Sequence, residues 1–154
     1  MNTVQITTHF EEAPVDRQKL ETLVETICDR FDLSGATVSV GVVDDAEIAE
    51  LNQKFLKHAR TTDCLSFDLS EAQGPRVLDV IVNGQMAIRQ AGRRGHSGEA
   101  ELALYVTHGL LHQLGFDDAT PEQARKMHET EDEILQHLGY GIVYNGDPEP
   151  RPAP

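Results

Sequence analysis

The chain has 154 residues, a length typical of one domain with a substantial core. Apolar residues make up 39% of it and charged residues 25%, which excludes wholesale disorder, and two lone cysteines, Cys28 and Cys64, exclude a disulfide framework. The net charge of −13 argues against a general nucleic-acid binder, because phosphate contacts require Lys and Arg.

Hydrophobic periodicity predicts alternating strands and helices, followed by two helices in succession. The expected elements, in chain order, are a strand at 3–9, a helix at 16–31, a strand at 36–42, a helix from Asp44 or Asp45 with Ile48, Leu51 and Phe55 on its inner stripe, strands at 64–69 and 77–82, and helices at 84–94, 98–114 and 121–138. This order predicts an α+β fold, a small mixed β-sheet packed with about five helices. Residues 1–140 are expected to form a single domain and the Pro-rich residues 141–154 a disordered tail.

No apolar run reaches the length of about 18 residues that a membrane span needs, so no membrane association is expected. The first residues lack the basic start and apolar core of a secretory signal. Together with the sparse cysteines, these features predict a reducing, cytoplasmic location.

Positive charge is concentrated in the middle of the chain. Residues 54–96 contain 7 basic and 4 acidic residues, whereas residues 1–53 and 97–154 each contain 3 basic and 11 acidic residues. A positive segment within an acidic chain predicts either a local phosphate-binding surface or an ordinary solvated face.

The helix expected at 98–114 is apolar on most of its circumference and should therefore be central. It carries His108 and His112, whose spacing of four residues places both imidazoles on one face. Gly115 can end the helix and turn Asp117 or Asp118 back toward them. Two histidines and a carboxylate with an open fourth position are typical of catalytic zinc. The alternative is a hydrogen-bonded pair of core histidines.

Several ordered motifs resemble the YbeY family of metal-dependent endoribonucleases, which act in ribosomal RNA maturation and ribosome quality control. The segment 108–118 (HGLLHQLGFDD) resembles the family hallmark H-G-x-L-H-x-x-G-Y-D-H. Residues 51–55 (LNQKF), 62–67 (TDCLSF), 78–82 (LDVIV) and 95–97 (GHS) resemble further family motifs in the same order. The resemblance covers about residues 36–139 and implies a metal held by His108, His112 and Asp118 at the end of the central helix.

The sequence departs from the family pattern at three positions. Asp118 replaces the third hallmark histidine, Leu56 replaces the arginine after LNxxY, and Thr61 replaces a proline. An aspartate ligand is harder and anionic, which keeps Zn²⁺ as the expected ion and makes Mn²⁺ or Mg²⁺ alternatives. Arg60 is expected to take over the phosphate contact of the missing arginine.

The resemblance also implies catalytic and binding roles. Ser66 lies on the strand expected beside the metal and could position substrate or water, or merely bond to backbone. The implied activity is metal-dependent cleavage of single-stranded RNA, with ribosomal RNA and the ribosome or its small subunit as partners. A ribosome-associated assembly factor with a structural or weakened metal site is the first alternative. A zinc peptidase is the second, disfavoured because Gly109 stands where HExxH enzymes carry their glutamate.

The other polar candidates have plainer interpretations. Asp117 is expected either to orient a ligand histidine or to form the turn after Gly115. His128 could replace Asp118 as third ligand, although a surface position is favoured. His96 could contact RNA, although an exposed position without such a role is expected. Asp79, which interrupts an apolar strand, is expected to have a structural role.

Overall fold

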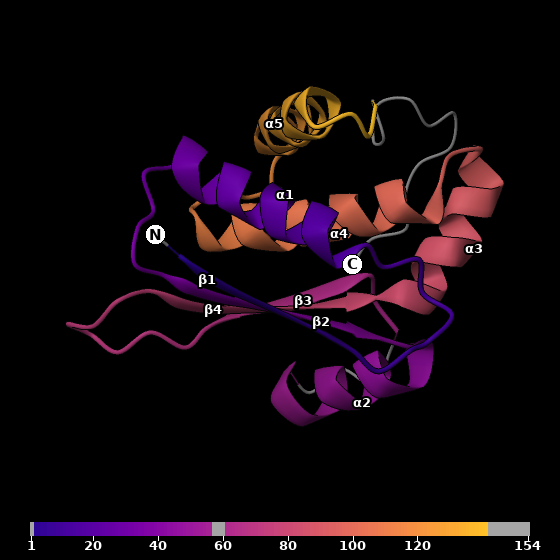
Figure 1. Cartoon of the computed structure of the whole chain (residues 1–154), viewed down its shortest axis with the longest axis horizontal. Helices are drawn as coiled ribbons and strands as arrows, with labels where there is room; N and C mark the ends of the chain where they lie inside the picture. Colours follow the sequence, from indigo (N-terminus) through magenta and orange to yellow (C-terminus); the bar gives the residue numbers. More distant parts are fainter. Residues whose placement is uncertain (1, 57–60, 142–154) are drawn as a thin grey trace.

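The computed structural model describes residues 2–56 and 61–141 (Figure 1). In chain order the elements of this part are β1 (Thr3–Thr8), α1 (Arg17–Arg30), β2 (Thr37–Val43), α2 (Asp45–Leu56), β3 (Cys64–Asp68), β4 (Val77–Asn83), α3 (Gly84–Arg94), α4 (Gly98–Gln113) and α5 (Pro121–His137). Every element predicted from the sequence is present, with bounds within a few residues of those expected.

The four strands form one mixed sheet in the order β1-β2-β4-β3. β1, β2 and β4 run parallel, whereas β3 pairs antiparallel with β4 and forms an edge of the sheet. The prediction of an α+β fold with a small mixed sheet and about five helices is therefore confirmed.

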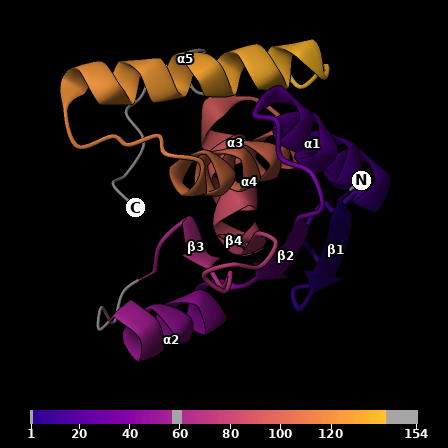
Figure 2. The same cartoon turned by 90° about the vertical axis from the view of Figure 1, so that its left-hand side faces the viewer.

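The helices are divided unequally between the two faces of the sheet. α1 and α4 lie on one face, with α5 stacked beyond them, and α2 alone lies on the other (Figures 1 and 2). Viewed at right angles to Figure 1, α2 sits below the β3–β4 side and leaves the β1 side of that face uncovered (Figure 2). The molecule thus has a thick side and a thin side.

The main hydrophobic core fills the space between the sheet and α1, α4 and α5. α4 is central to it, because all its residues from Ala100 to Leu111 are buried. This burial around the whole circumference matches the expectation from its apolar sequence. A separate small cluster of Val43, Ile48 and Leu65 lies beneath α2, with Leu51, Phe67 and Ile81 packed against it.

Local hydrogen bonds fix the starts of the helices as the sequence suggests. The side chains of Ser97 and Thr120 accept hydrogen bonds from the backbone N–H groups of Ala100 and Gln123. Gln123 in turn accepts from the backbone N–H of Thr120, completing the predicted capping box. At α2 it is Asp44 that accepts from the N–H of Glu47.

One expected core residue is not in the core. Phe55 was assigned to the inner stripe of α2, but its side chain is 55% exposed. The reason is its place in the last turn of α2, because the small cluster beneath that helix involves Ile48 and Leu51 from its earlier turns. The predicted tail is outside the described residues from 142 onward, and none of the described helices is long and apolar enough to span a membrane.

Candidate metal centre

The buried helix α4 brings His108 and His112 to its carboxyl end. His108 is buried, and the side chain of His112 is 31% exposed, so the pair extends from the core to the surface. Their Nε2 atoms are 3.1 Å apart, and their rings meet edge to face. The two rings are within hydrogen-bond distance of each other, as the alternative of a core histidine pair expects, but His112 is partly exposed and therefore not enclosed in the core.

Gly109 explains how this helix reaches the sheet. A Cβ atom at this position would lie 2.7 Å from Cys64 Sγ and 2.9 Å from Val80 Cγ1, closer than such atoms approach. The absence of a side chain therefore lets α4 press directly against β3 and β4. A glutamate at this position, as a zinc peptidase of the HExxH type needs, has no space here.

A glycine-dependent turn brings the third polar group back to the helix end. Gly115 has φ +102°, and the N–H groups of Phe116 and Gly115 donate to the carbonyls of Leu111 and His112. This is the hydrogen-bond pattern of a Schellman motif, which closes a helix and reverses the chain. As a result Asp118 faces the two histidines.

The three candidate ligands converge on one point. The two carboxylate oxygens of Asp118 are each 3.8 Å from an Nε2 atom, Oδ2 from that of His108 and Oδ1 from that of His112. Ligand atoms bound tetrahedrally to one zinc ion at about 2.0–2.1 Å are separated by roughly 3.3 Å. One atom from each of the three residues lies within 4.8 Å of the others, so small side-chain adjustments suffice to hold a divalent cation.

Glu131 on α5 contacts His108 on the side away from Asp118, a role for which the sequence has no local signal. Its Oε2 atom lies 2.7 Å from His108 Nδ1, and its Oε1 atom lies 2.7 Å from His128 Nδ1. Burial would raise the pKa of the Glu131 carboxyl, but the hydrogen bonds and charges of the two histidines together outweigh burial and lower that pKa. A carboxylate can only accept hydrogen bonds, so both Nδ1 atoms donate to Glu131. The Nε2 atom of His108 is then directed away from Glu131, toward His112 and Asp118.

His128 is thereby placed differently from its expected surface position. Its side chain is only 12% exposed, and its ring stacks on that of His108 at 6.1 Å between centroids. His108, His128 and Glu131 form a second group with metal-ligand chemistry. Because Glu131 already accepts a hydrogen bond from each histidine, this group acts as a support for His108.

Ser66 lies on edge strand β3, beside the carboxyl end of α4. Its Oγ accepts a hydrogen bond of 3.0 Å from Nε2 of Gln113, the residue that follows His112. Gln113 was not identified from the sequence, since an amide next to a histidine has no distinctive spacing. Arg60 lies outside the described residues, so its predicted contact stays a prediction.

Asp117 forms the turn. Its Oδ1 accepts a hydrogen bond from the backbone N–H of Asp118, and no contact with either ligand histidine is recorded for this described residue. Of the two alternatives left open by the sequence, the geometry favours the turn-forming one. Asp117 is therefore a suitable control for Asp118, because it is also an aspartate but its carboxylate forms the turn.

Three of the seven basic residues in the positive middle segment form ion pairs in the described part of the chain. Arg76 pairs with Asp68 and Arg89 with Asp45, and both of these pairs lie at the surface. Arg94 is 3% exposed and lies 3.1 Å from Glu101, which is fully buried. These pairs leave the segment with less positive charge for phosphate than its composition suggests.

His96 was expected to be exposed, and this is wrong. Its Nε2 atom lies 2.6 Å from Glu101 Oε1, and its side chain is 21% exposed. The reason is the buried carboxylate of Glu101, which requires polar partners. His96 therefore joins Arg94 in satisfying Glu101, at the junction of α3 and α4.

Comparison with known proteins identifies relatives of the whole domain. The family model described as Endoribonuclease YbeY matches residues 5–139. The chain belongs to the YbeY family. It is 38% identical over 132 residues to a protein of Thermobifida fusca named Endoribonuclease YbeY, covering 79% of this chain and 85% of that protein. A relative of the same name from Aquifex aeolicus is 34% identical over 136 residues, covering 86% and 91%.

A solved structure agrees with the fold. The solution structure of a protein from Thermotoga maritima matches with a TM-score of 0.58 and 27% identity, covering 88% of this chain and 91% of that one. The resemblance predicted from the motifs is thus confirmed, and with it the membership of this chain in a family of endoribonucleases, enzymes that hydrolyse RNA.

Proposed function

We propose that this member of the YbeY family is a metal-dependent endoribonuclease that cuts single-stranded RNA, with ribosomal RNA in the ribosome or its small subunit as its natural substrate. The observation that carries the proposal is the approach of Asp118 to the Nε2 atoms of His108 and His112. The ribosomal substrate rests on the family resemblance.

In this proposal each residue of the centre has one task. His108, His112 and Asp118 hold the cation, and Glu131 fixes the ring of His108 with its Nε2 lone pair directed at the site. When bound, a divalent cation in such a site polarises a phosphoryl oxygen or makes water more acidic. Ser66, held by Gln113, orients substrate or water near the helix end. Arg60 contributes a phosphate contact.

Zinc is the proposed ion, because two imidazoles and one carboxylate form a common catalytic zinc set. The anionic oxygen of Asp118 also suits harder ions, so Mn²⁺ or Mg²⁺ are the alternatives. The negative charge of Asp118 reduces the Lewis acidity of the ion relative to a third neutral histidine. We therefore expect slower cleavage than a three-histidine site gives, together with firm retention of the cation.

Metal content separates a working site from a disabled one. We would measure bound metal per chain by elemental analysis in the wild type, in Asp118→Ala and in Asp117→Ala. About one zinc in the wild type and in Asp117→Ala, with much less in Asp118→Ala, would support the proposed ligands. A wild-type protein that stays empty after incubation with zinc and with manganese would contradict them and favour the assembly-factor alternative.

Cleavage is tested with the same proteins. Wild-type protein should cut a single-stranded RNA, lose this activity in a chelator and regain it with added metal. His112→Ala should be inactive, because it removes one of the three proposed ligands. Cleavage that survives both chelation and His112→Ala would contradict the proposal, since it would come from a contaminating nuclease. Arg60→Ala should weaken cleavage, and unchanged activity would remove Arg60 from the site.

A further inference from the structure

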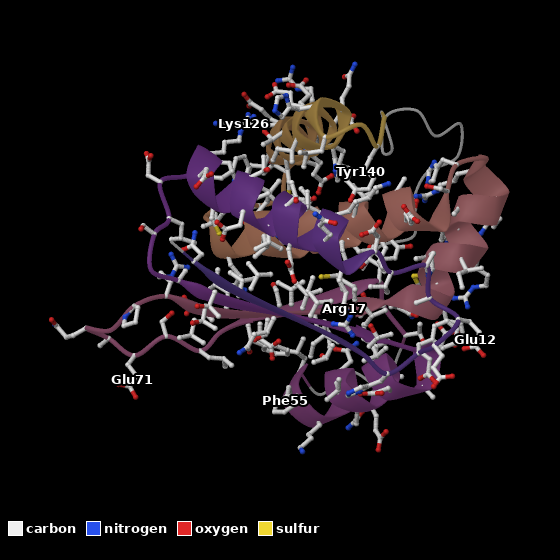
Figure 3. All side chains as sticks on the ribbon, in the orientation of Figure 1. Glu12, Arg17, Phe55, Glu71, Lys126 and Tyr140 are labelled. Carbon is white, nitrogen blue, oxygen red and sulfur yellow. The ribbon has the colours of Figure 1, made fainter. Side chains whose placement is uncertain are left out.

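The thin side of the sheet carries an exposed aromatic ring that the metal centre does not explain. Phe55, in the last turn of α2, is 55% exposed and is absent from the small cluster beneath that helix. Figure 3 shows its side chain at α2, on the side of the sheet away from α4. A single exposed apolar side chain is common at protein surfaces, so only what surrounds this ring can indicate a role for it.

The Phe55 ring is held in place by two neighbours. It meets the ring of Phe67 edge to face, with 5.6 Å between centroids and an angle of 61° between the planes. Phe67 is anchored, because its ring packs against the cluster of Val43, Ile48 and Leu65. The Lys54 ammonium lies over the Phe55 ring, 5.4 Å from its centroid, on a flexible side chain that a stacking base can displace toward a phosphate. The result is an oriented, partly exposed ring beside a cation.

We propose that Phe55, Phe67 and Lys54 form a base-stacking platform that binds one unpaired nucleobase of the RNA substrate. Aromatic rings beside a positive charge are the general means by which proteins bind single-stranded RNA without reading its sequence. This inference rests on the proposed function, because it presumes that RNA occupies the metal centre.

Edge strand β3 connects the platform to the end of α4 that carries the candidate metal ligands. Ser66 and Phe67 are consecutive on β3, so their side chains point to opposite faces. Ser66 bonds to Gln113 at the end of α4, and Phe67 contacts Phe55 on α2. Since β3 is the edge strand, an RNA backbone that passes over this edge can place a phosphate on one side and a base on the other.

The charges of the protein also favour a stacking contribution. Its net charge is −13, and Arg76, Arg89 and Arg94 of the middle segment are each paired with a carboxylate. Affinity for RNA must therefore depend less on phosphate contacts than in a basic protein. Stacking on Phe55 needs no net charge. Its contribution to affinity should therefore depend little on salt concentration, whereas phosphate contacts weaken as salt is added.

The experiment measures RNA binding in the absence of metal and therefore without cleavage. A single-stranded RNA oligonucleotide with a fluorescent label is titrated with wild type, Phe55→Ala, Phe55→Leu and Phe55→Tyr. Ile88→Ala, which removes an exposed apolar side chain from α3, is the matched control. We expect Phe55→Ala and Phe55→Leu to weaken binding by about 5- to 100-fold, and Phe55→Tyr and Ile88→Ala to leave it nearly unchanged.

An abasic scan identifies the contact. Each base of the oligonucleotide is removed in turn, and one abasic position should weaken binding to wild type as much as Phe55→Ala does. The same abasic RNA should bind Phe55→Ala with no further loss, because both changes remove one interaction. Additive losses at every position would overturn the proposal.

Two other outcomes also decide it. If Phe55→Ala binds RNA like wild type but changes the molecular mass in light scattering, the ring contacts protein and the proposal is wrong. If one abasic position weakens binding to wild type but not to Phe55→Ala, and yet the wild type cuts no RNA, the platform is supported and the proposed activity is wrong. Circular dichroism of each variant checks the fold, which an exposed ring should not affect.

Discussion

Two neighbouring rows of side chains cross the sheet, one on each face, and they differ in almost every property. The row of Ile6, Val40, Val80 and Ser66 faces α4, and its first three members are buried. The row of Gln5, Ser39, Asp79 and Phe67 faces the α2 side, and none of its members is fully buried. Both rows end on edge strand β3.

The difference shows how one sheet serves two kinds of contact. On the thick side α4 packs between the sheet and α5, and this packing orients the two histidines that we propose as metal ligands. On the thin side α2 covers part of the face and leaves Phe55 exposed. We infer that the thick side orients the candidate metal ligands, whereas the thin side offers an exposed surface for contacts with RNA.

The largest expected effect tests the unequal packing of the two sides. Leu104→Ala on α4 should destabilise the protein by about 3–5 kcal/mol, because its fully buried side chain would leave a cavity. Leu51→Ala on α2 should cost only about 1 kcal/mol, since Leu51 is partly buried. Urea unfolding measures both, and equal losses would remove the distinction between the sides.

A second change tests the contact between α4 and the sheet. Gly109→Ala should destabilise the fold by about 1–3 kcal/mol, because its Cβ meets Cys64 and Val80. Gly92→Ala, in the interior of α3 with no atom within 4 Å of the added Cβ, should instead stabilise by about 0.5–1 kcal/mol. Thermal unfolding of the pair gives opposite signs if the close approach is real.

Glu131→Gln tests the support behind the metal centre. Each carboxylate oxygen of Glu131 accepts a hydrogen bond from one histidine Nδ1, whereas a glutamine side chain has only one oxygen and can accept only one of the two. Because His108 is then less well oriented, zinc affinity should fall about 10- to 100-fold. Glu129→Gln changes an exposed residue of the same helix and should leave zinc affinity as it is. Competition with a chromophoric chelator measures both, and equal affinities would show that Glu131 does not orient His108.

The smallest expected effect is a pH dependence on the thin side. Burial raises the pKa of the Asp79 carboxyl, so the folded protein holds this proton more tightly than the unfolded chain. The stability that the proton provides is present below the unfolded pKa and is lost as the pH rises through the folded one. Asp79→Asn should therefore stabilise at pH 7, by about 0.5 kcal/mol, and have no effect in acid.

Asp68→Asn is the matched control with the opposite sign. Hydrogen bonds from Ser70, and then the charge and hydrogen bond of Arg76, lower the pKa of the Asp68 carboxyl. Its contribution is present above the unfolded pKa and is lost as the pH falls through the folded one. Asp68→Asn should therefore lower the melting temperature at pH 7. A higher melting temperature for both Asp68→Asn and Asp79→Asn would contradict the opposite pKa shifts of the two carboxyls.

Local signals made most of the fold predictable. The caps Ser97 and Thr120 and the terminating Gly115 act within one helical turn, so a single sequence contains all the information they need. The spacing of His108 and His112 belongs to the same class, because four residues are one turn. The turn after α4 also indicated that an aspartate would return to these histidines.

The features that escaped prediction depend on distant parts of the chain. Glu131 lies 23 residues from His108, and only its place between Met127 and Leu135 on a buried stripe hinted that it was enclosed. His128 is partly buried because it bonds to the buried carboxylate of Glu131, and His96 because it bonds to that of Glu101. Phe55 has the spacing of a core residue, but whether a stripe is covered depends on where the helix ends relative to the sheet.

The complete burial of α4 has a consequence for the order in which the molecule opens. Amide hydrogens between Ala100 and Leu111 have no local route to solvent, so they should exchange only through global unfolding. Asp118 lies in the connection between α4 and α5 and is 30% exposed on its side chain, so this segment can open while the helix stays closed. A cation bound by Asp118 would therefore exchange with solvent at a rate set by the opening of the segment between α4 and α5, and not by the unfolding of α4.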